Sequence, residues 1–544
     1  MTAGTLAALC IFAAACTKVS TGPAGQTSGR HSWTRAGELR IAIQAPPNTL
    51  NPLLASNTTE SMMTRLTNDV LVSVDASGRQ EVPVLAAEVP TLENGGISRD
   101  GLTITYKLRH NVVWHDGVPF SSKDVKFTWT AIMNPRNNVI SRTGYELVRS
   151  VDTPDPFTVV FHMKQRFSPA VNTLFGESDS PYTIVPEHLL ARYPNINSVS
   201  YNTNPVGTGP FKLKTWARGD HLEYEPNPRY FLGVPKLQRI IVKIVPDENT
   251  SLNQLRTHET DFQYQASPQE YPQVKTLPNL RVVLNQMNQI ERLQLNNARF
   301  PLTDVHLRQA MAYAIDKERL VNELTFGSAV AADQDLPPFM WAHAQNITRY
   351  PYDPPRARTI LRADGWTPGP DGVLQKAGHR LSLEIVYNTS NATRRRGVVL
   401  VQAMLRQVGI ETQVKSYIAS LLFAPYGMGG ILQTGKFDVS FAGWVAGIDP
   451  DNSSEFMCSA RPPNGNNTDF YCSAAMDAAQ KQALENFDIP TRKRAYDTIE
   501  ALLTSQEVEI PLWWPRQIEP VNPDFMGFTP NPVTESWNSY QWAI

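Results

Sequence analysis

Short stretches of the chain alternate between polar and apolar residues, as strands with one buried face do. Residues 103–108, TITYKL, alternate in this way and predict a half-buried strand. Residues 157–163 and 239–245 are rich in β-branched side chains and predict two further strands. In the second half, residues 410–414 predict another. These stretches are separated by longer segments with a different periodicity.

The intervening segments carry helix signals. Ser121 and Asp124 have the spacing of a capping box, and the apolar residues after them recur as on one helix face. Asn134-Pro135 ends this helix. Asp304 is expected to cap a second helix, whose apolar residues also share one face.

Two more helices are predicted further along. Asp353-Pro354-Pro355 is a start signal and Gly365 a stop. Residues 398–408 form the next helix, and the basic run Arg394 to Arg396 precedes it as a solvated surface. This alternation of helices and strands predicts an α/β fold in which helices pack on sheets.

Two glycine-containing segments are predicted to be structural. Asp116-Gly117 favours a tight turn, because glycine accepts positive φ. Residues 207–210, GTGP, combine free and locked φ values, as a close crossing of two chain segments requires. Neither matches a phosphate-binding loop. Trp513-Trp514 is expected to be core at a domain junction.

The N-terminus carries an export signal. Leu6 to Ala15 are ten apolar or small residues. Ten helical residues span only about 15 Å, half of a bilayer core. We therefore predict a signal peptide at residues 1–16. The small residues before Cys16 resemble a bacterial lipobox, in which the cysteine is lipidated; secretion with loss of Cys16 is the alternative. Residues 17–36, rich in Ser, Thr and Gly, are predicted to be a flexible tether.

Composition and charge argue against some classes of partner and chemistry. The chain has 544 residues, enough for several compact units, and its formal net charge of −1 gives no reason to expect a nucleic-acid partner. Cys458 and Cys472 are expected to form a disulfide, since export permits one and no CxxC or nearby histidine suggests metal or redox work.

Catalytic motifs do not fit the chain. Residues 176–180, GESDS, lack the final glycine of GxSxG, and His258-Glu259 lacks the second histidine of HExxH. His110 and His115 are a poor metal pair. We therefore expect no enzyme activity, no cofactor and no metal site.

Five segments, in collinear order, carry a family resemblance. They are Thr49 to Pro52, the stretch from Tyr106 to Val125 that contains WHDG, Pro205 to Phe211, Arg308 to Asp316, and Tyr352 to Trp366. Together they resemble the family 5 extracellular solute-binding proteins of bacterial ABC transporters, which include oligopeptide- and dipeptide-binding proteins. The resemblance covers about residues 37 to 544.

The resemblance implies a two-lobed periplasmic-binding-protein type II fold. Lobe I would comprise residues 37–290 with an extra subdomain at about 81–204, and lobe II residues 291–511. Residues 512–544 would return to lobe I. Ligand would be enclosed as the lobes close about a hinge. The protein would act as a monomer.

The resemblance also points to ligand-contacting residues. Gly443-Trp444 is similar to a glycine–tryptophan step that borders the pocket in peptide-binding members, and Asn51 lies in the family's opening turn. An aspartate three residues after the tryptophan holds the peptide's ammonium group in those members, but here that position is Gly447. Either Asp449, with Asp451 nearby, takes this role, or the ligand has no free amino terminus. The cysteine pair also matches dipeptide-binding members.

The predicted function is therefore a periplasmic or cell-surface lipoprotein that captures peptides for ABC permease subunits. One alternative is the same fold with a non-peptide ligand, such as an oligosaccharide, an opine or a chelated metal. The other is a sensory lipoprotein without a transporter.

Overall fold

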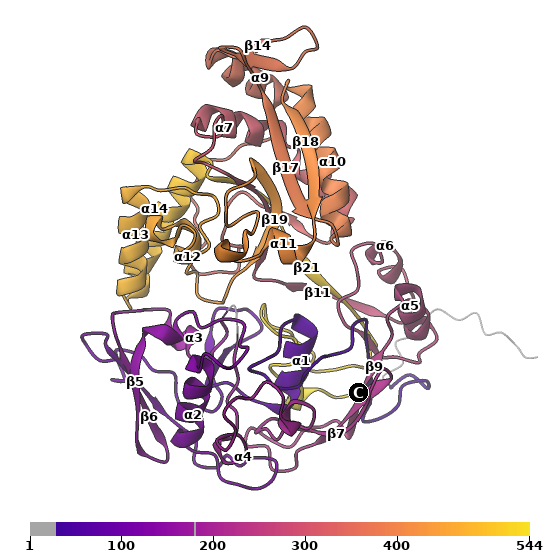
Figure 1. Ribbon diagram of the computed structural model, residues 1–544. Helices are drawn as coiled ribbons and strands as arrows, with labels where there is room; N and C mark the ends of the chain where they lie inside the picture. The colour runs from indigo at the N-terminus through magenta and orange to yellow at the C-terminus, as the bar shows by residue number, and fades with distance from the viewer. Residues whose placement is uncertain (1–28, 179–180) are drawn as a thin grey trace, which may run out of the picture.

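The computed structural model describes residues 29–178 and 181–544, and the protein consists of two lobes stacked one above the other (Figure 1). The expected signal peptide, Cys16 and the first part of the tether lie outside the described residues. No helix in the described ranges is long and apolar enough to cross a membrane.

Lobe I, the lower body in Figure 1, is built on a seven-stranded mixed sheet. Its strands, in spatial order, are β11 (Arg281–Gln286), β21 (Arg516–Val521), β10 (Phe262–Gln263), β1 (Glu38–Ile43), β9 (Arg239–Ile244), β8 (His221–Pro226) and β7 (Phe211–Ala217). Its helices are α1 (Thr58–Thr67), α5 (Glu248–Arg256) and α6 (Tyr271–Val274). A separate apolar core, including Leu39, Ile41 and Trp542, fills this lobe.

The expected subdomain of lobe I has its own sheet and its own core. Strands β4 (Thr103–Lys107), β6 (Thr158–Met163) and β5 (Val148–Asp155) form an antiparallel sheet. The hairpin β2 (Val72–Val74) and β3 (Glu81–Pro83), with helices α2 (Ser122–Met133), α3 (Ala170–Thr173) and α4 (Glu187–Leu190), accompanies it. The predicted capping box at the start of α2 is present. Fully buried Trp114 and Phe161 belong to the core.

Lobe II is built on a six-stranded sheet. In spatial order its strands are β13 (Val330–Ala331), β20 (Glu509–Trp514), β12 (Gln289–Leu295), β19 (Val439–Val445), β17 (Ser382–Asn388) and β18 (Glu411–Tyr417). A small sheet of β14 (Thr367–Pro368), β15 (Leu374–Lys376) and β16 (His379–Arg380) lies at the far tip (Figure 1). Trp513 is part of the core of this lobe, and Trp514 packs in a separate small cluster with Ile290 and Ala332, so both are buried as expected.

Three helices were predicted in lobe II, and all three are present, one of them with an earlier start. The helices of this lobe are α7 (Val305–Ala314), α8 (Lys317–Thr325), α9 (Pro354–Ala363), α10 (Ala392–Gln407), α11 (Ala419–Leu422), α12 (Ser453–Phe456), α13 (Ala474–Glu485) and α14 (Ile489–Gln506). The side chains of Asp304 and Asp353 cap α7 and α9. Helix α10, however, is capped by Asn391 and starts six residues before the expected Val398. The basic run therefore lies within the helix, not ahead of it, because a polar first turn hides the start from a periodicity search.

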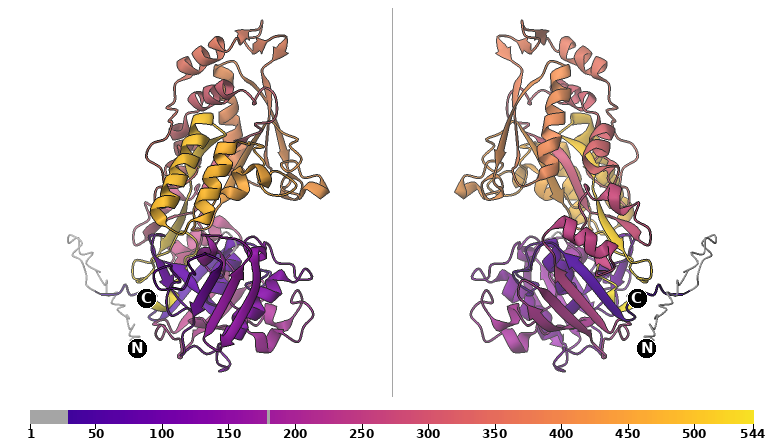
Figure 2. Two further views of the ribbon diagram at one scale, coloured as in Figure 1. Left: turned by 90° about the vertical axis from the view of Figure 1, so that its left-hand side faces the viewer. Right: turned by 90° about the vertical axis from the view of Figure 1, so that its right-hand side faces the viewer.

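Two chain crossings connect the lobes. The first runs from β11 to β12, between Gln286 and Gln289, and the second from β20 to β21, through Pro515. The C-terminal stretch after β21 lies on lobe I (Figure 2).

The GTGP segment is a close crossing, as predicted. A Cβ on Gly207 would lie 1.7 Å from the backbone oxygen of Thr67, and the Gly209 amide donates to that oxygen at 2.9 Å. His115 braces the same segment: its Nδ1 accepts from the Gly207 amide and its Nε2 donates to the Gly209 carbonyl. Burial lowers the pKa of His115 to about 4, so it is a neutral structural residue at pH 7.

The last residues of the expected tether are packed on lobe I, which corrects that expectation. Thr34 and His31 bind Asp524 at 2.6 and 3.0 Å, and the Trp33 ring stacks on His258 with centroids 3.6 Å apart. The Gly37 amide donates to the carbonyl of the last residue, Ile544, at 3.1 Å. The composition of this segment predicted flexibility, whereas the Trp33 ring packs it against lobe I.

Candidate functional site

A cavity of about 480 Å³ lies between the subdomain of lobe I and lobe II. Residues 143–147 and 165–178 line it on the side of lobe I, and residues 444–464 and 481–485 on the side of lobe II. Small-molecule sites in proteins commonly measure about 300–1,000 Å³. A second cavity at the lobe junction, lined by Arg516, Asn391 and Trp513 among others, measures about 140 Å³ and is below that range. A cavity of about 530 Å³, lined by Lys107, His110 and Phe157 among others, lies wholly within lobe I. Because the cavity of about 480 Å³ has a suitable size and is lined by both lobes, it is the candidate ligand site.

Strand β19 delivers Trp444 to the wall of this cavity. Its neighbour Ile290 on β12 lies directly opposite, and Trp444 packs with it and with Trp514. The ring is only partly buried, so one face of it remains available to a ligand. Trp444 thus lines the candidate cavity, and its contact with a ligand stays a prediction.

Gly447 lines the cavity with backbone alone. Its carbonyl accepts a hydrogen bond from the Asn288 side chain, and the next amide, of Ile448, donates to the Glu177 carbonyl of lobe I at 2.9 Å. This loop is therefore held from both lobes. No side chain at position 447 can pair with a charged ligand group.

Asp449 lines the cavity but is already bound to a buried arginine. Its carboxylate accepts from Arg492 of α14 at 2.6 Å, and both side chains are less than 10% exposed. The Arg492 guanidinium also donates to the Ala483 carbonyl and lies over the ring of Trp341. Sequence reasoning missed Arg492, since nothing in the sequence links it to a loop 43 residues earlier.

Asp451 is a second aspartate at the cavity, which Glu146 and Glu485 also line. Its carboxylate accepts from the Ser453 amide at 2.9 Å, and within the described ranges no lysine or arginine forms an ion pair with it. Burial raises the pKa of Asp451, the hydrogen bonds from Ser453 lower it, and the nearby Asp449 charge raises it. Burial also raises the pKa of Glu81, which accepts a hydrogen bond at 2.8 Å from the cavity residue Asn172. A cation entering here would relieve the repulsion among these acids.

Gly443 supports the site from the other face of the sheet and does not line the cavity. A Cβ there would lie 2.6 Å from both Arg394 Nη2 and Glu291 Oε1. These two side chains form a bidentate ion pair with both distances 2.8 Å. The glycine thus makes room for a pair that ties α10 to β12.

Asn51 is not at the cavity. It is fully buried, its amide donates to the Asn202 side chain at 2.9 Å, and its Oδ1 accepts from the Leu53 amide at 3.0 Å. Its hydrogen bonds shape the turn after β1.

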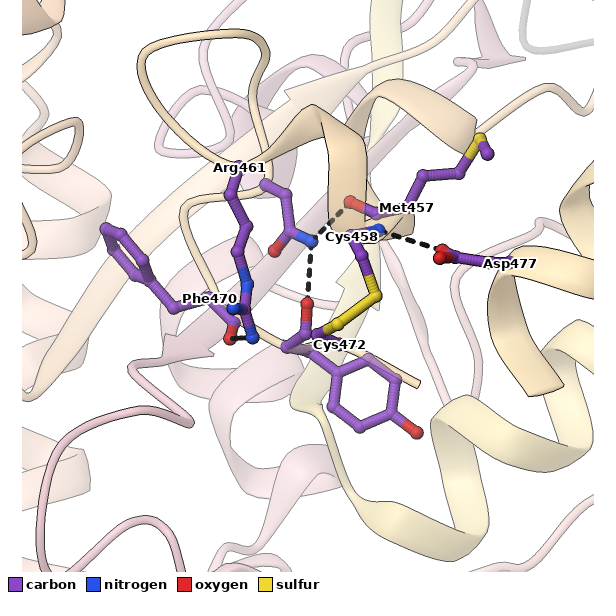
Figure 3. The surroundings of a disulfide bond; sticks show 8 residues. Met457, Cys458, Arg461, Phe470, Cys472 and Asp477 are labelled. Carbon is purple, nitrogen blue, oxygen red and sulfur yellow. Dashed lines mark hydrogen bonds between the residues drawn. A yellow bond between two sulfur atoms is a disulfide. The ribbon is translucent and has the colours of Figure 1, made fainter. Parts of the chain in front are cut away.

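A disulfide joins Cys458 and Cys472 and closes the cavity's loop in lobe II (Figure 3). The Asn467 amide bridges the carbonyls of Met457 and Tyr471, and the Cys458 amide donates to Asp477 of α13 at 2.8 Å. Residues 459, 460 and 464 within this loop line the cavity. The bridge therefore fixes part of the ligand wall.

A family model and known relatives agree on the family that this chain is similar to. The model of the bacterial extracellular solute-binding proteins, family 5 (middle region), matches residues 80–465. The chain is 25% identical over 548 residues to the oligopeptide-binding protein AppA of Bacillus subtilis (strain 168), covering 99% of this chain and 97% of AppA. It is 27% identical over 506 residues to the glutathione-binding protein GsiB of Salmonella typhimurium, covering 92% of this chain and 93% of GsiB.

Solved structures share the fold. NikZ from Campylobacter jejuni, in complex with Ni(L-His), is 26% identical with a TM-score of 0.75, covering 94% of this chain and all of NikZ. AppA from Bacillus subtilis, in complex with a nonapeptide, is 24% identical with a TM-score of 0.74, covering 93% and 98%. The architecture is accordingly the two-lobed type II periplasmic-binding-protein fold. Since the family model spans most of the chain and these relatives align almost end to end, the chain belongs to the bacterial extracellular solute-binding proteins of family 5.

Proposed function

We propose that this protein captures a small peptide outside the cytoplasm and delivers it, unchanged, to the permease subunits of an ABC importer. The observation that carries the proposal is the cavity of about 480 Å³ between the lobes, with a tryptophan and an acid without an ion pair at its wall. The relatives AppA and GsiB, whose names specify oligopeptide and glutathione binding, support it.

Within this proposal, Asp451 holds the peptide's ammonium group and Trp444 forms an apolar wall beside it. Asp449 is the weaker candidate for the ammonium, because Arg492 already occupies its carboxylate. A buried cation needs a carboxylate partner to offset its desolvation. Gly447 contributes backbone, while Gly443 and Asn51 act through the groups that they position.

Calorimetric titration with short alanine peptides tests the site. Asp451→Asn is expected to weaken binding of a peptide with a free amino terminus at least tenfold and to leave an N-acetylated peptide unaffected, since only the former brings a charge. Trp444→Ala should weaken both. Equal loss for the two peptides in Asp451→Asn would contradict the ammonium assignment.

A chelated metal is the second candidate, and Gly447 is the observation that favours it. A ligand without an ammonium group needs no carboxylate at that position, and the structural relative NikZ is described with Ni(L-His). Native mass spectrometry on protein gently purified from cells separates the two. A ladder of masses that fragments into amino acids supports the peptide; a single metal-containing mass supports the chelate.

We further propose that the protein is exported, cleaved before Cys16 and anchored in the membrane by lipid on that cysteine, and that it acts as a monomer. The proposals of export and of lipidation rest on the sequence of residues 1–16. Cells fed labelled palmitate should label the protein, and Cys16→Ser should lose the label. Secretion of unlabelled wild-type protein into the medium would favour the alternative without an anchor.

A further inference from the structure

The loop closed by the Cys458–Cys472 disulfide (Figure 3) contains the dipeptide Asn464-Gly465. Asn464 is exposed and lies at the wall of the candidate cavity. In an asparagine–glycine dipeptide the backbone nitrogen of the glycine reaches the asparagine side chain most easily, because glycine has no side chain and a permissive backbone. The chain contains one other such dipeptide, Asn94-Gly95. The two dipeptides differ in their hydrogen bonds.

Both groups that would react are unrestrained at Asn464-Gly465. Within the described residues, the Asn464 side chain makes no hydrogen bond, and the Gly465 amide donates to no acceptor. The dipeptide is held through other backbone atoms: the Asn464 amide donates to the Arg461 carbonyl at 3.0 Å, and the Gly465 carbonyl accepts from the Gln433 side chain at 3.3 Å. The Asn464 side chain can therefore turn toward the Gly465 nitrogen without losing a hydrogen bond.

The side chain of Asn94, in contrast, is held on both of its polar atoms. Its Oδ1 accepts from the amides of Thr91 and Gly96, each at 2.9 Å. Its Nδ2 donates to the Val89 carbonyl at 2.8 Å. A reaction at Asn94-Gly95 would first have to break these hydrogen bonds.

The packing of the loop explains why position 465 is glycine. A Cβ there would lie 2.6 Å from the carbonyl oxygen of Ala460 and 2.9 Å from its Cα. Both are backbone atoms that cannot move aside without shifting the loop. The fold therefore requires Gly465, and the reactive dipeptide follows from the asparagine before it.

We propose that Asn464 is a site of spontaneous deamidation, and that its conversion adds a carboxylate to the cavity wall and shifts ligand preference toward cationic solutes. The Gly465 backbone nitrogen attacks Cγ of Asn464. A bond between that nitrogen and Cγ forms, the bond between Cγ and Nδ2 breaks, and ammonia leaves with the proton of the backbone amide. Water then opens the resulting succinimide ring at either carbonyl carbon and yields aspartate or isoaspartate.

The new carboxylate would change the balance of charge at the cavity. The charged side chains that line the cavity are four acids and two bases: Glu146, Asp449, Asp451, Glu485, Arg166 and Lys481. A fifth acid on this wall attracts a cationic ligand group and repels an anionic one. The effect on ligand choice rests on the proposed binding function, whereas the modification itself does not.

Peptide mapping by mass spectrometry tests the modification. Purified protein is kept at mildly alkaline pH, which favours loss of the amide proton, and is sampled over several weeks. Asn464 is expected to convert to aspartate and isoaspartate, and Asn94 in the same molecules at least about tenfold more slowly, because its hydrogen bonds must open first. Asn464→Gln keeps an amide on the wall and should stay intact, since its longer side chain would have to close a larger ring.

Titration calorimetry tests the effect on ligands, with pentaalanine whose central residue is replaced by lysine or by glutamate. The affinity for the lysine peptide relative to the glutamate peptide should be about two- to fivefold higher in Asn464→Asp than in freshly purified wild type, the range for one partly exposed charge pair. The same ratio should rise in wild type during storage and stay constant in Asn464→Gln.

Three results would contradict the inference, each in a different part. An intact Asn464, or equal rates at Asn464 and Asn94, overturns the modification site. A lysine-to-glutamate ratio that is the same in Asn464→Asp and in wild type overturns the effect on ligand choice. If no form of the protein binds either peptide, the proposed peptide function fails together with that effect, while the mapping still decides whether Asn464 is modified.

Discussion

At the scale of single residues, the two aspartates of the cavity differ in what they already bind. Asp449 and Arg492 form a buried pair, whereas Asp451 has only hydrogen bonds from Ser453. An acid with a buried cationic partner serves the fold first, and an acid without one can serve a ligand. Position 447, where the family resemblance leads one to look, has no side chain at all.

This difference predicts a large loss of stability from one substitution and a small change from the same substitution two residues on. Asp449→Asn should lower the free energy of unfolding by about 3–5 kcal/mol, because it leaves the Arg492 charge buried and unpaired. Asp451→Asn, the matched control two residues on, should change it by less than about 1 kcal/mol. Urea denaturation of both variants measures this. Similar losses in the two would show that the Arg492 pair does not stabilise the loop.

A second pair of buried acids predicts a pH effect. The Gln517 side chain donates to Glu535 and also to Glu519. Burial raises the pKa of Glu535 to about 7 from its ordinary 4.5, and burial together with the Glu535 charge raises the pKa of Glu519. A raised folded-state pKa gives stability that is complete below pH 4.5 and is lost as pH rises through 7.

Glu535→Gln removes this titration. Between pH 5 and pH 8, wild type should therefore lose about 2 kcal/mol of stability relative to the variant. Urea denaturation at the two pH values measures the difference, with the exposed Glu93→Gln as control. A wild type and Glu535→Gln that respond alike to pH would show that Glu535 is charged at pH 5 in the fold.

At the scale of elements, the sequence predicted helix caps and turns more accurately than it predicted the lengths of the elements. Ser121, Asp304 and Asp353 start helices as expected, because a cap needs only its neighbours in sequence. The early start of α10 was missed although Asn391 caps it, because its first turn is polar and shows no apolar periodicity. Arg394 in that turn pairs instead with Glu291, more than a hundred residues away. The family resemblance led to Trp444, which lines the candidate cavity, but the pairing of Asp449 with Arg492 depends on tertiary contacts that no local pattern encodes.

The disulfide predicts a coupled loss of stability and binding. Replacing both Cys458 and Cys472 by serine removes the cross-link of a loop of about 15 residues, worth about 3 kcal/mol in the chain-entropy model. Since this loop lines the cavity, peptide affinity should fall as well. Denaturation and calorimetry measure both. Treatment of wild type with reductant is the control and should reproduce the double variant; unchanged stability would mean that the hydrogen bonds of Asn467 suffice.

At the scale of the whole molecule, the two lobes are built from different parts of the chain. Lobe I is assembled from the beginning and the end of the described chain, and lobe II from the segment between the two crossings. We expect lobe closure to change the backbone angles of residues 286–289 and 514–516, as hinge segments do in other binding proteins.

The hydrogen bond from the Gly37 amide to the Ile544 carbonyl has a mechanical consequence. A force applied between residue 37 and the C-terminus is carried across this contact and through lobe I, whose strand β1 lies at the start of the load path. Lobe II bears none of that load until lobe I opens. Lobe II, which forms one wall of the cavity, therefore lies outside the load path between residues 37 and 544.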